Sequence, residues 1–419
     1  MKKIVKVGYI GLGRQGFSML NRGFSEMKDV QIVIVCDLDE SKLQKAVDML
    51  VEKGRPAPKI TKDYQDVVND PEIDAVIIAS GWNTHMAMAK ASVLAGKYTA
   101  VEVGCAYDLQ ECFDLIEAYE KTKAPLMMLE NCCYGRDELM VLNMVKQGLF
   151  GEIVHCKGGY MHYLPCTELL VAGQFNHYRL QEYIHRNCEQ YPTHQLGPIS
   201  KCLSLNRGNR MMKLTSVASK SRALNEYIKK YRPEEELQNL EFKQGDIVNT
   251  VITCANGETI LLTLDTTLPR PYYSRDFAVR GTRGCYTEDR YSVFLEEGRH
   301  CDWSDMNNRE KFYETHDHPL NKEYYSGEQK GGHGGIDWLV YRAFIESVKN
   351  ETNTPIDAYD TVSWMAIAPL SEMSIQLGGA PVDVPDFTKG KWIRREPPVT
   401  GKYSLDVVVS DPDTPIIPE

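Results

Sequence analysis

The chain has 419 residues, 42% of them hydrophobic and 25% charged; this usage is globular, leaves room for two packed domains and excludes a disordered or collagen-like chain. The net charge is -10, and the most basic stretch, "SKSRALNEYIKKYR", is interrupted by glutamate, which argues against a nucleic-acid partner. The twelve cysteines include no C-x-x-C pair, which predicts a cytoplasmic protein without a metal site. No apolar run approaches the ~20 residues of a membrane span, so no membrane contact is expected.

The first predicted element is an apolar strand that ends in a glycine turn. "KIVKVGYIGLGRQG" breaks into Gly11, Gly13, Arg14, Gln15 and Gly16, and "FSMLNRGFSEM" continues as a helix. Glycines arrive too early for a signal peptide. A strand, a glycine turn and a helix in this order are typical of a dinucleotide site, where the helix start binds the pyrophosphate. A purely structural glycine turn is the alternative.

The next strand, "VQIVIVCDLD", ends at Asp37, 21 residues beyond Gly16. A carboxylate at this place accepts hydrogen bonds from the adenosine ribose and repels a 2'-phosphate, which favours NAD over NADP. Strands and helices continue to alternate through "IDAVIIAS", "HMAMAKASVLAG", "YTAVEVG", "LQECFDLIEAYEKT" and "APLMMLEN". This order predicts a doubly wound parallel sheet, a Rossmann domain over residues 1–130.

Polar side chains follow two of these strands. "IIASGWNTH" is expected to leave its strand into a loop that carries Trp82, Asn83 and His85, and "AVEVG" ends another strand at Glu102. Ligands of such sheets bind at the carboxyl ends of the strands. His85 therefore either packs at a helix start or lies beside the nicotinamide half of the cofactor.

The second half of the chain changes pattern. A helical segment, "DELMVLNMVKQGLFG", leads into the strand "EIVHCKGGYMH", and apolar and polar residues then alternate on both sides of Asn256-Gly257, a strong hairpin signal. These patterns predict a second domain, residues 131–385, with antiparallel strands. The proline-rich tail, residues 386–419, is expected to be extended and to wrap a surface or a neighbouring subunit.

The opening "GLGRQG", the H-x-x-x-A-x-x-x-L-x-A-G-K stretch from His85 to Lys97 and the strand ending at Glu102 resemble the glucose-fructose oxidoreductase, inositol dehydrogenase and MocA superfamily. The resemblance implies an α/β fold, with a Rossmann domain followed by an α+β domain on an open, mainly antiparallel sheet. It also implies a homo-oligomer, a dimer or tetramer built on that sheet. Dehydrogenases of the superfamily usually carry Glu-Lys-Pro where this chain has Glu102-Val103-Gly104, so the usual lysine is missing.

Longer blocks narrow the resemblance. "MMLENCCYGRDELMVLNMVKQGLFGEIVHCKGGYMH", "YPTHQLGPI", "PYYSRDFAVRGTRG", "GGHGGIDWLV" and "PVDVPDFTKGKW" resemble glycoside hydrolase family 109, NAD-dependent enzymes described as alpha-N-acetylgalactosaminidases. The match runs from about residue 4 to about residue 393. It implies that NAD lies among Asp37, Trp82, Asn83, Thr84, His85, Glu102, Val103 and Asn131, and that a glycoside lies among Tyr160, Arg179, Tyr191, Pro192, Thr193, His194 and Tyr273. Gly104, Pro192 and Gln195 depart from the family pattern and bear on the substrate, and the expected export signal is absent.

NAD-dependent hydrolysis is an exception to the two-carboxylate scheme of glycosidases. Oxidation of the sugar at C3 acidifies the C2 proton, whose loss expels the group at C1; water then adds, and reduction at C3 regenerates NAD. Such a route needs groups that move protons near neutral pH. "CEQYPTHQLGPI" is interpreted as a proline-stiffened loop that presents Tyr191 and His194. His194 is the candidate for the C3 hydroxyl proton, and Tyr191 or Tyr273 for the C2 proton and the water.

Each candidate also has a structural interpretation. His194 could cap or pack at a helix start, Arg179 could pair with Glu182, Tyr160 could line the core, and Tyr273 could cover a sheet edge. His333 in "GGHGGID" is a further candidate for the site, or part of a turn. For the whole chain, the alternatives to a glycosidase are a net NAD-dependent sugar dehydrogenase, disfavoured by the missing lysine, and a non-catalytic NAD-linked sugar sensor.

Overall fold

The computed structural model describes residues 2–171, 178–296, 306–398 and 401–409. The chain forms two compact units, and each is assembled from separate segments. Unit 1 contains residues 1–143, 317–363 and 396–419, and unit 2 contains residues 144–316 and 364–395. The predicted division at residues 130 and 385 remains a proposal. Residues 399–400 and 410–419 of the predicted tail lie outside the described residues.

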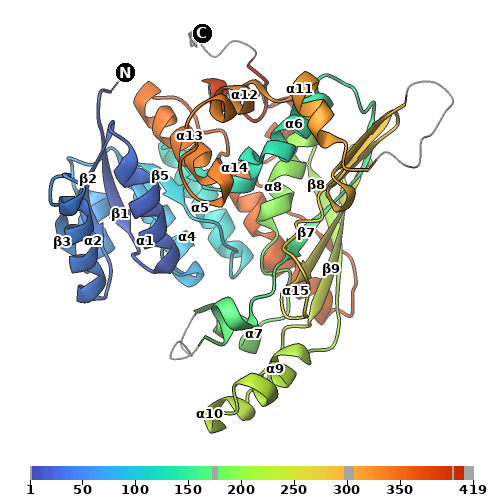
Figure 1. Cartoon of the computed structure of the whole chain (residues 1–419), viewed down its shortest axis with the longest axis horizontal. Coiled ribbons are helices and arrows are strands. Elements are labelled where there is room, and N and C mark those ends of the chain that lie inside the picture. The colour runs from blue at the N-terminus through green and yellow to red at the C-terminus, as the bar shows by residue number, and fades with distance from the viewer. Residues whose placement is uncertain (1, 172–177, 297–305, 399–400, 410–419) are drawn as a thin grey trace. The chain divides into compact units, whose positions relative to one another are not determined.

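Unit 1 is built on a parallel sheet of six strands in the order β3-β2-β1-β4-β5-β6 (Figure 1). The central strand β4 is wholly apolar and buried, and β1 is buried except at Lys6, as expected when helices cover both faces of a sheet. The order reverses between β1 and β4, which opens a crevice at their carboxyl ends. The strands are β1 Val5–Ile10, β2 Val30–Cys36, β3 Lys59–Thr61, β4 Ala75–Ile78, β5 Tyr98–Val101 and β6 Leu126–Met128.

Two sets of helices belong to unit 1. The first alternates with the strands: α1 Arg14–Arg22, α2 Glu40–Glu52, α3 Tyr64–Asn69, α4 Trp82–Leu94 and α5 Leu109–Thr122, with short 3-10 turns η1 Phe24–Glu26 and η2 Asn131–Tyr134. The second comes from the late part of the chain: α12 Pro319–Ser326, η5 His333–Gly335 and α13 Ile336–Asn350. Tyr341 of α13 stacks on Phe24 at 4.7 Å between ring centroids, so the late segment is part of the core of unit 1.

Unit 2 is built on a sheet of eight strands in the order β13-β12-β11-β7-β10-β9-β8-β14. Neighbouring strands are antiparallel except for β7 and β10. The strands are β7 Ile153–Met161, β8 Met211–Ala218, β9 Ile247–Cys254, β10 Thr259–Asp265, β11 Ala278–Gly281, β12 Gly284–Thr287, β13 Ser292–Leu295 and β14 Val382–Asp383. The predicted hairpin at Asn256-Gly257 joins β9 to β10, where Gly257 has a φ of +98°.

The helices of unit 2 are α7 Tyr178–His185, α8 Thr193–Cys202, α9 Ala223–Tyr231, α10 Glu235–Gln238, α11 Arg309–His316 and α15 Ile367–Gln376, with a π-turn η3 Pro165–Leu169 and a 3-10 turn η6 Lys391–Arg394. The chain changes units within α6 Arg136–Lys146 and α14 Ala358–Met365. The predicted fold class, a doubly wound parallel sheet plus a mainly antiparallel one, is confirmed. In the part of the chain that the structure describes, no helix combines the length and apolarity that crossing a bilayer requires.

Candidate active site

The glycine turn of unit 1 has the geometry of a dinucleotide site. Gly11 has a φ of +95°, and a Cβ there would lie 2.5 Å from the carbonyl of Ala79. A Cβ on Gly16 would lie 2.2 Å from the Gly11 oxygen, so both glycines are required by packing. Around Gly13, in contrast, no described atom lies within 4 Å of an added Cβ. Gly13 therefore faces open space at the uncapped start of α1, where a pyrophosphate can approach the amides.

Asp37 is tied to the same turn. Its Oδ2 accepts the amide of Leu12 at 2.7 Å and its Oδ1 accepts the amide of Asp39 at 3.0 Å. The carboxylate therefore holds the glycine turn against the end of β2. A carboxylate oxygen can accept more than one hydrogen bond, so this role is compatible with binding a ribose hydroxyl as well.

Residues 82–85 do not form the predicted loop; they are the first turn of α4, so that prediction is wrong. Thr84 joins this helix start to the residues before it, because its Oγ1 donates to the Gly81 carbonyl at 2.8 Å and pairs with Ser80 Oγ at 2.7 Å. Asn83 is exposed and Thr84 half-buried, whereas Trp82 and His85 are buried. Only Asn83 and Thr84 of the four therefore offer side chains at the surface of the helix start.

His85 is a packed, neutral imidazole. It is 1% exposed, its Nε2 lies 2.9 Å from the Ser80 carbonyl, and burial lowers its pKa to about 4. At neutral pH, Nε2 must carry the hydrogen that meets the carbonyl. Gly104 lies alongside: a Cβ there would be 2.8 Å from Trp82 Cδ1 and 3.1 Å from His85 Nδ1. Glycine at position 104 therefore accommodates the packed first turn of α4.

Asn131 links the Rossmann strands to the late segment of unit 1. Its Nδ2 donates to Asp337 Oδ1 at 2.6 Å, and Asp337 Oδ2 pairs with His333 Nδ1 at 2.8 Å. A Cβ on Gly332 would lie 2.5 Å from Asp337 Oδ2, so glycine is needed for the carboxylate to reach its place. The "GGHGGID" motif is therefore a shaped segment that joins a predicted cofactor residue to His333.

A cavity of about 380 Å³ lies between this segment and α1. It is lined by Arg14, Gln15, Ser18, Met19, Arg22, Gly23, Gly332, His333, Asp337 and Tyr341. Arg14 and Gln15 belong to the glycine fingerprint. The lining contains two arginines, Arg14 and Arg22, and one carboxylate, Asp337. The cavity therefore suits an anionic ligand, and together with the open space at Gly13 it fits the diphosphate of a dinucleotide.

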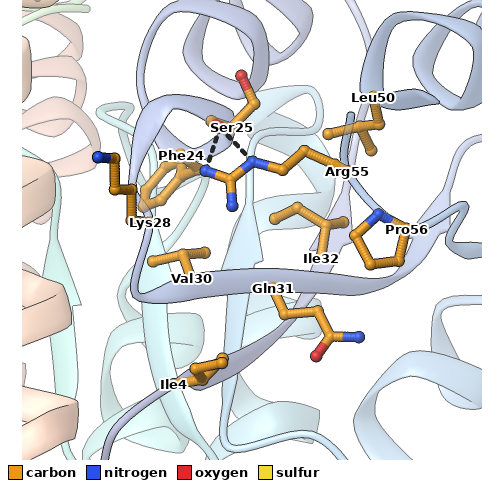
Figure 2. Close-up of a pocket in the computed structure, with 10 residues that line it drawn as sticks. All are labelled: Ile4, Phe24, Ser25, Lys28, Val30, Gln31, Ile32, Leu50, Arg55 and Pro56. Atoms are coloured by element: carbon orange, nitrogen blue, oxygen red, sulfur yellow. Dashed lines mark hydrogen bonds between the residues drawn. The ribbon is translucent and has the colours of Figure 1, made fainter. Parts of the chain in front are cut away.

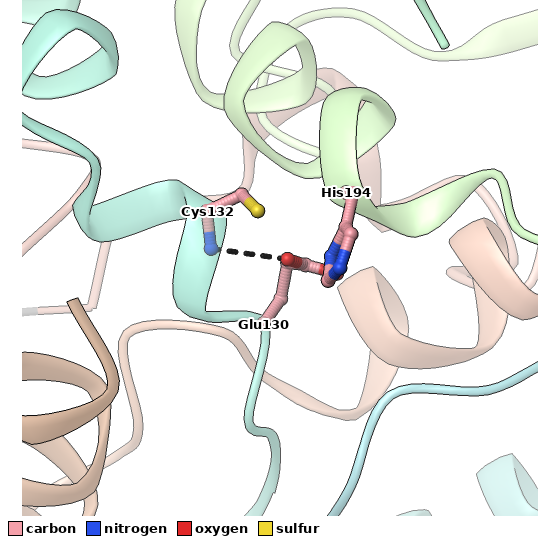
Figure 3. A group of neighbouring side chains, drawn as sticks. All are labelled: Glu130, Cys132 and His194. Carbon is pink, nitrogen blue, oxygen red and sulfur yellow. Dashed lines mark hydrogen bonds between the residues drawn. The ribbon is translucent and has the colours of Figure 1, made fainter. Parts of the chain in front are cut away.

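Glu130, between β6 and η2, is fully buried. Its Oε1 accepts the amide of Cys132 at 3.1 Å and caps η2, as Figure 3 shows. Cys132 and Cys133 are buried free thiols, and every described cysteine is free. Glu130 thereby holds the turn that carries Asn131.

A smaller cavity in unit 1, of about 120 Å³, lies beside β2 (Figure 2). Its lining is mostly apolar: Ile4, Phe24, Ser25, Lys28, Val30, Gln31, Ile32, Leu50, Arg55 and Pro56. Arg55 donates to the Ser25 carbonyl from Nε at 2.9 Å and from Nη2 at 2.6 Å. The guanidinium is thus used to close the turn after α1, and we assign the cavity to packing.

In unit 2, two adjacent glycines of β7 determine where the predicted sugar residues lie. A Cβ on Gly158 would be 2.4 Å from Gln195 Cβ, and one on Gly159 would be 2.2 Å from the Thr263 carbonyl. The glycines therefore let α8 and β10 approach β7 closely. Tyr160, the next residue along β7, comes to lie against the start of α8.

The start of α8 agrees with the structural interpretation of His194, which placed it at a helix start. The loop of "CEQYPTHQLGPI" ends at Pro192, and α8 begins at Thr193, so His194 lies in the first turn of the helix, as Figure 3 shows. The helix continues through Pro198, which has no amide to donate one turn back, and every residue of α8 except His194 is buried.

Tyr160 is the centre of an aromatic cluster. Its ring stacks on Tyr191 at 4.3 Å, and edge contacts join it to His194 at 5.5 Å and to Tyr273 at 6.2 Å. Tyr191 and His194 are themselves 4.7 Å apart. The cluster runs from 6% exposure at Tyr160 to 46% at Tyr273, so it opens from the interior to the surface. Four residues from three separate segments thus converge, and Tyr160 is the buried end of the cluster.

Arg179, on α7, completes the cluster. Its guanidinium carbon lies 5.0 Å from the centre of the Tyr191 ring, and its Nη1 pairs with Glu168. Burial opposes its charge, but the Glu168 carboxylate raises its pKa well above the ordinary value. The alternative predicted for Arg179 was a pair with Glu182; the structure shows its pair with Glu168, and Glu182 pairs with Arg186 at 3.4 Å.

Glu189 is a buried residue of this loop that the sequence did not single out. It is 1% exposed, and its Oε2 has no hydrogen-bond partner among the described residues. Burial raises its pKa to about 8, although the Tyr191 amide, which donates to the carboxyl, lowers it. Glu189 is therefore mostly protonated at neutral pH and fixes the backbone before Tyr191.

Four more residues of these surroundings were missed: His162, Glu168, Asp337 and Arg22. Strand periodicity could have found His162, because residues 160 and 162 share a face of an extended chain. Glu168 gave no signal. Arg22 follows Arg14 by two helical turns, but its importance depends on the late segment that faces it. Apart from these, the predicted cofactor residues lie in unit 1 and the predicted sugar residues in unit 2.

Comparison with known proteins agrees with this arrangement. The family model "Glycosyl hydrolase 109, C-terminal domain" matches residues 134–394, and "Oxidoreductase family, NAD-binding Rossmann fold" matches residues 5–130. The alpha-N-acetylgalactosaminidase of Tannerella forsythia is 37% identical over 418 residues, 94% of this chain and 88% of that protein. A glycosyl hydrolase family 109 protein of Stenotrophomonas maltophilia is 38% identical, over 95% of this chain and 93% of its own.

Solved structures share the fold. An NAD binding oxidoreductase from Klebsiella pneumoniae superposes with a TM-score of 0.70 at 17% identity, covering 91% of this chain and all 100% of its own. Levoglucosan dehydrogenase, in complex with NADH and levoglucosan, gives 0.70 at 18% identity with the same coverage. At such identities the likeness concerns the fold alone, whereas the family match concerns the sequence. The chain belongs to glycoside hydrolase family 109 and is a glycoside hydrolase with an NAD-binding oxidoreductase-type domain.

Proposed function

We propose that the protein is an exo-acting alpha-N-acetylgalactosaminidase that uses NAD as a recycled cofactor. The convergence of Tyr160, Tyr191, His194 and Tyr273 in unit 2 supports this most directly. These side chains offer a stacking surface for a sugar ring and several groups that can exchange protons. The name of the Tannerella forsythia relative supports the choice of sugar.

The residues of unit 1 would hold the cofactor. The amides at the start of α1 and Arg14 would bind the diphosphate, and Asp37 the adenosine ribose. Asn131, which is hydrogen-bonded to Asp337, would bind the dinucleotide beyond its diphosphate, and Asp337 in turn pairs with His333. When bound, NAD supplies an oxidant for sugar C3 and afterwards returns the same two electrons.

The residues of unit 2 would bind the sugar and move protons. His194 would remove the C3 hydroxyl proton, and Tyr191 or Tyr273 would remove the C2 proton and later activate water. Arg179 would hold ring hydroxyls with its forked donors, which Glu168 keeps in one orientation. Glu189 and the prolines that flank the loop fix Tyr191 and His194 before substrate binds, which reduces the entropy lost on binding.

Replacing His194 by alanine tests the assignment. Release of nitrophenol from nitrophenyl alpha-N-acetylgalactosaminide should be abolished, while the protein should still bind NAD. Turnover close to that of the wild type would contradict the role of His194. Net accumulation of NADH by the wild type would instead favour a sugar dehydrogenase.

We also propose that the protein is a cytoplasmic homo-oligomer that uses the sheet of unit 2. Four apolar residues of this sheet are 40–54% exposed: Val154, Met212, Val217 and Val251. Exposed apolar residues on one sheet suit contact with a second copy. The free thiols of the described cysteines suit a reducing compartment. Light scattering coupled to size exclusion should give a dimer or tetramer, and a monomer would contradict the oligomer.

A further inference from the structure

Tyr160 and His162 form a hydrogen-bonded pair within the aromatic cluster. The Tyr160 hydroxyl lies 3.0 Å from His162 Nδ1, and the two rings meet edge to face at 5.7 Å. His162 also contacts the edge of Tyr273, at 5.4 Å. One imidazole therefore joins two tyrosines of the proposed sugar site.

The backbone fixes this pair from both sides. The His162 amide donates to the Asp265 carbonyl at 3.0 Å, and Met161 exchanges two hydrogen bonds with Ser274, at 3.0 and 3.1 Å. Ser274 is next to Tyr273 in the chain. Residues 160, 162 and 273 are thus held by the end of β7 and its two neighbouring segments, so Nδ1 is aimed at the hydroxyl before any ligand binds.

We propose that Tyr160 and His162 act as one acid–base pair of the sugar site, in which His162 positions the Tyr160 hydroxyl and exchanges a proton with it; this rests on the proposed function. When a ligand C–H or O–H proton moves to the Tyr160 oxygen, the phenolic proton moves to His162 Nδ1. The ligand then carries one more negative charge and the imidazole one more positive charge. The reverse transfer restores both side chains.

This arrangement suits chemistry near neutral pH. A phenol alone has a pKa of about 10, too high to serve as an efficient base, whereas imidazole has one of about 6.5. Coupling the two lets a tyrosine oxygen touch the sugar while a histidine takes up the proton. In this pair His162 acts through the Tyr160 hydroxyl, so it is a positioning residue, and its effect should depend on that hydroxyl.

His155 is a matched control on the same strand. Its Nδ1 lies 2.8 Å from Thr259 Oγ1, so it too pairs with a hydroxyl through Nδ1, but residue 155 lies on the opposite face of β7 from Tyr160. Burial lowers its pKa, with Arg280 and Lys157 adding to the effect. His155→Gln therefore reports what the loss of a strand histidine does by itself.

The test is a double-mutant cycle on the holoenzyme, with His162→Gln, Tyr160→Phe, the double variant and His155→Gln. The readouts are kcat for nitrophenol release, KM, and the dissociation constant for NAD. Each variant of the pair should lose about a hundredfold in kcat, a usual size for acid–base catalysis. The double variant should lose little more than either alone, because residues that act as a unit are not additive. His155→Gln should stay near the wild type.

The cycle is repeated with His162→Asn, so that a misfolded glutamine variant does not decide the outcome, and circular dichroism checks each fold. Losses that multiply in the double variant would overturn the proposal, since a structural role of His162 does not depend on the Tyr160 hydroxyl. A kcat of His162→Gln close to wild type would also overturn it. If the wild type binds NAD but releases no nitrophenol, the proposed function fails first and the inference falls with it.

Discussion

Replacing Glu189 by glutamine should change how the stability of the protein depends on pH. The carboxyl is 1% exposed, and burial raises its pKa from 4.5 to about 8. The folded protein therefore keeps this proton up to about pH 8, whereas the unfolded chain loses it near pH 4.5. Glutamine removes the titration but keeps a carbonyl that can accept the Tyr191 amide.

The size of the effect follows from linkage. Between the two pKa values the folded state binds more protons than the unfolded state, so the free energy of unfolding falls as pH rises. The contribution is complete below pH 4.5 and is lost as the pH rises toward 8. The loss is about 1.4 kcal/mol for each pH unit. At pH 7 the free energy of unfolding lost in this way amounts to about 3 kcal/mol, a large part of the stability of a domain.

Urea unfolding at pH 5, 6, 7 and 8, followed by circular dichroism, measures this difference. The free energy of unfolding of Glu189→Gln minus that of the wild type should increase steadily with pH. The cost of burying an amide is independent of pH, so it does not affect the slope. Glu241→Gln, an exposed carboxyl of the same unit, is the control. Parallel curves for Glu189→Gln and the wild type would refute the reasoning.

Three further variants test the two sites. Gly11→Ala should weaken NAD binding at least about tenfold, because its Cβ would lie 2.5 Å from the Ala79 carbonyl at the end of the neighbouring strand. Gly54 also has a positive φ but lies in open space, so Gly54→Ala should bind NAD normally in calorimetry. Asp337→Asn should weaken NAD binding by a similar factor, since it loses the charge that holds Asn131 and His333. Lys330→Ala is the control, and an unchanged affinity of Asp337→Asn for NAD would contradict the role of the late segment. Arg179→Ala should raise KM about tenfold or more with a smaller effect on kcat, and an unaltered KM would exclude it from sugar binding.

The Rossmann part of the fold could be predicted because its signals are local. A buried apolar strand, a glycine turn and a helix follow one another within 22 residues, and Asp37 comes at the expected distance. The hairpin at Asn256-Gly257 is equally local. Such patterns depend on backbone sterics and on burial of consecutive side chains, which the sequence states directly.

One helix start was misplaced. α4 begins at Trp82, earlier than expected, because the burial of Trp82 and His85 outweighs what a loop-like sequence favours. α8 begins at Thr193, as the structural interpretation of His194 had it. The residues of the cluster around Tyr160 were predicted from a family resemblance. The sequence alone could not show that Tyr160, Tyr191 and Tyr273 meet, since that depends on strand register and on two glycines of β7.

Partners distant in the sequence were the least predictable. Asn131 and Asp337 are 206 residues apart, and their hydrogen bond exists only because the chain returns to unit 1 after the sheet of unit 2. Glu168 and Glu189 look like ordinary surface acids until burial is known. Their effects on Arg179 and on the Tyr191 loop are consequences of desolvation, which no local pattern records.

One measurement tests the central claim most directly. The protein is incubated with NAD and nitrophenyl alpha-N-acetylgalactosaminide in heavy water, and nitrophenol release, NADH and deuterium at C2 of the freed sugar are followed together. Nitrophenol release with deuterium at C2 and no net NADH is the predicted result, because C2 must lose its proton before the bond to the aglycone breaks. Release without deuterium at C2, or NADH that accumulates without release, would contradict the account.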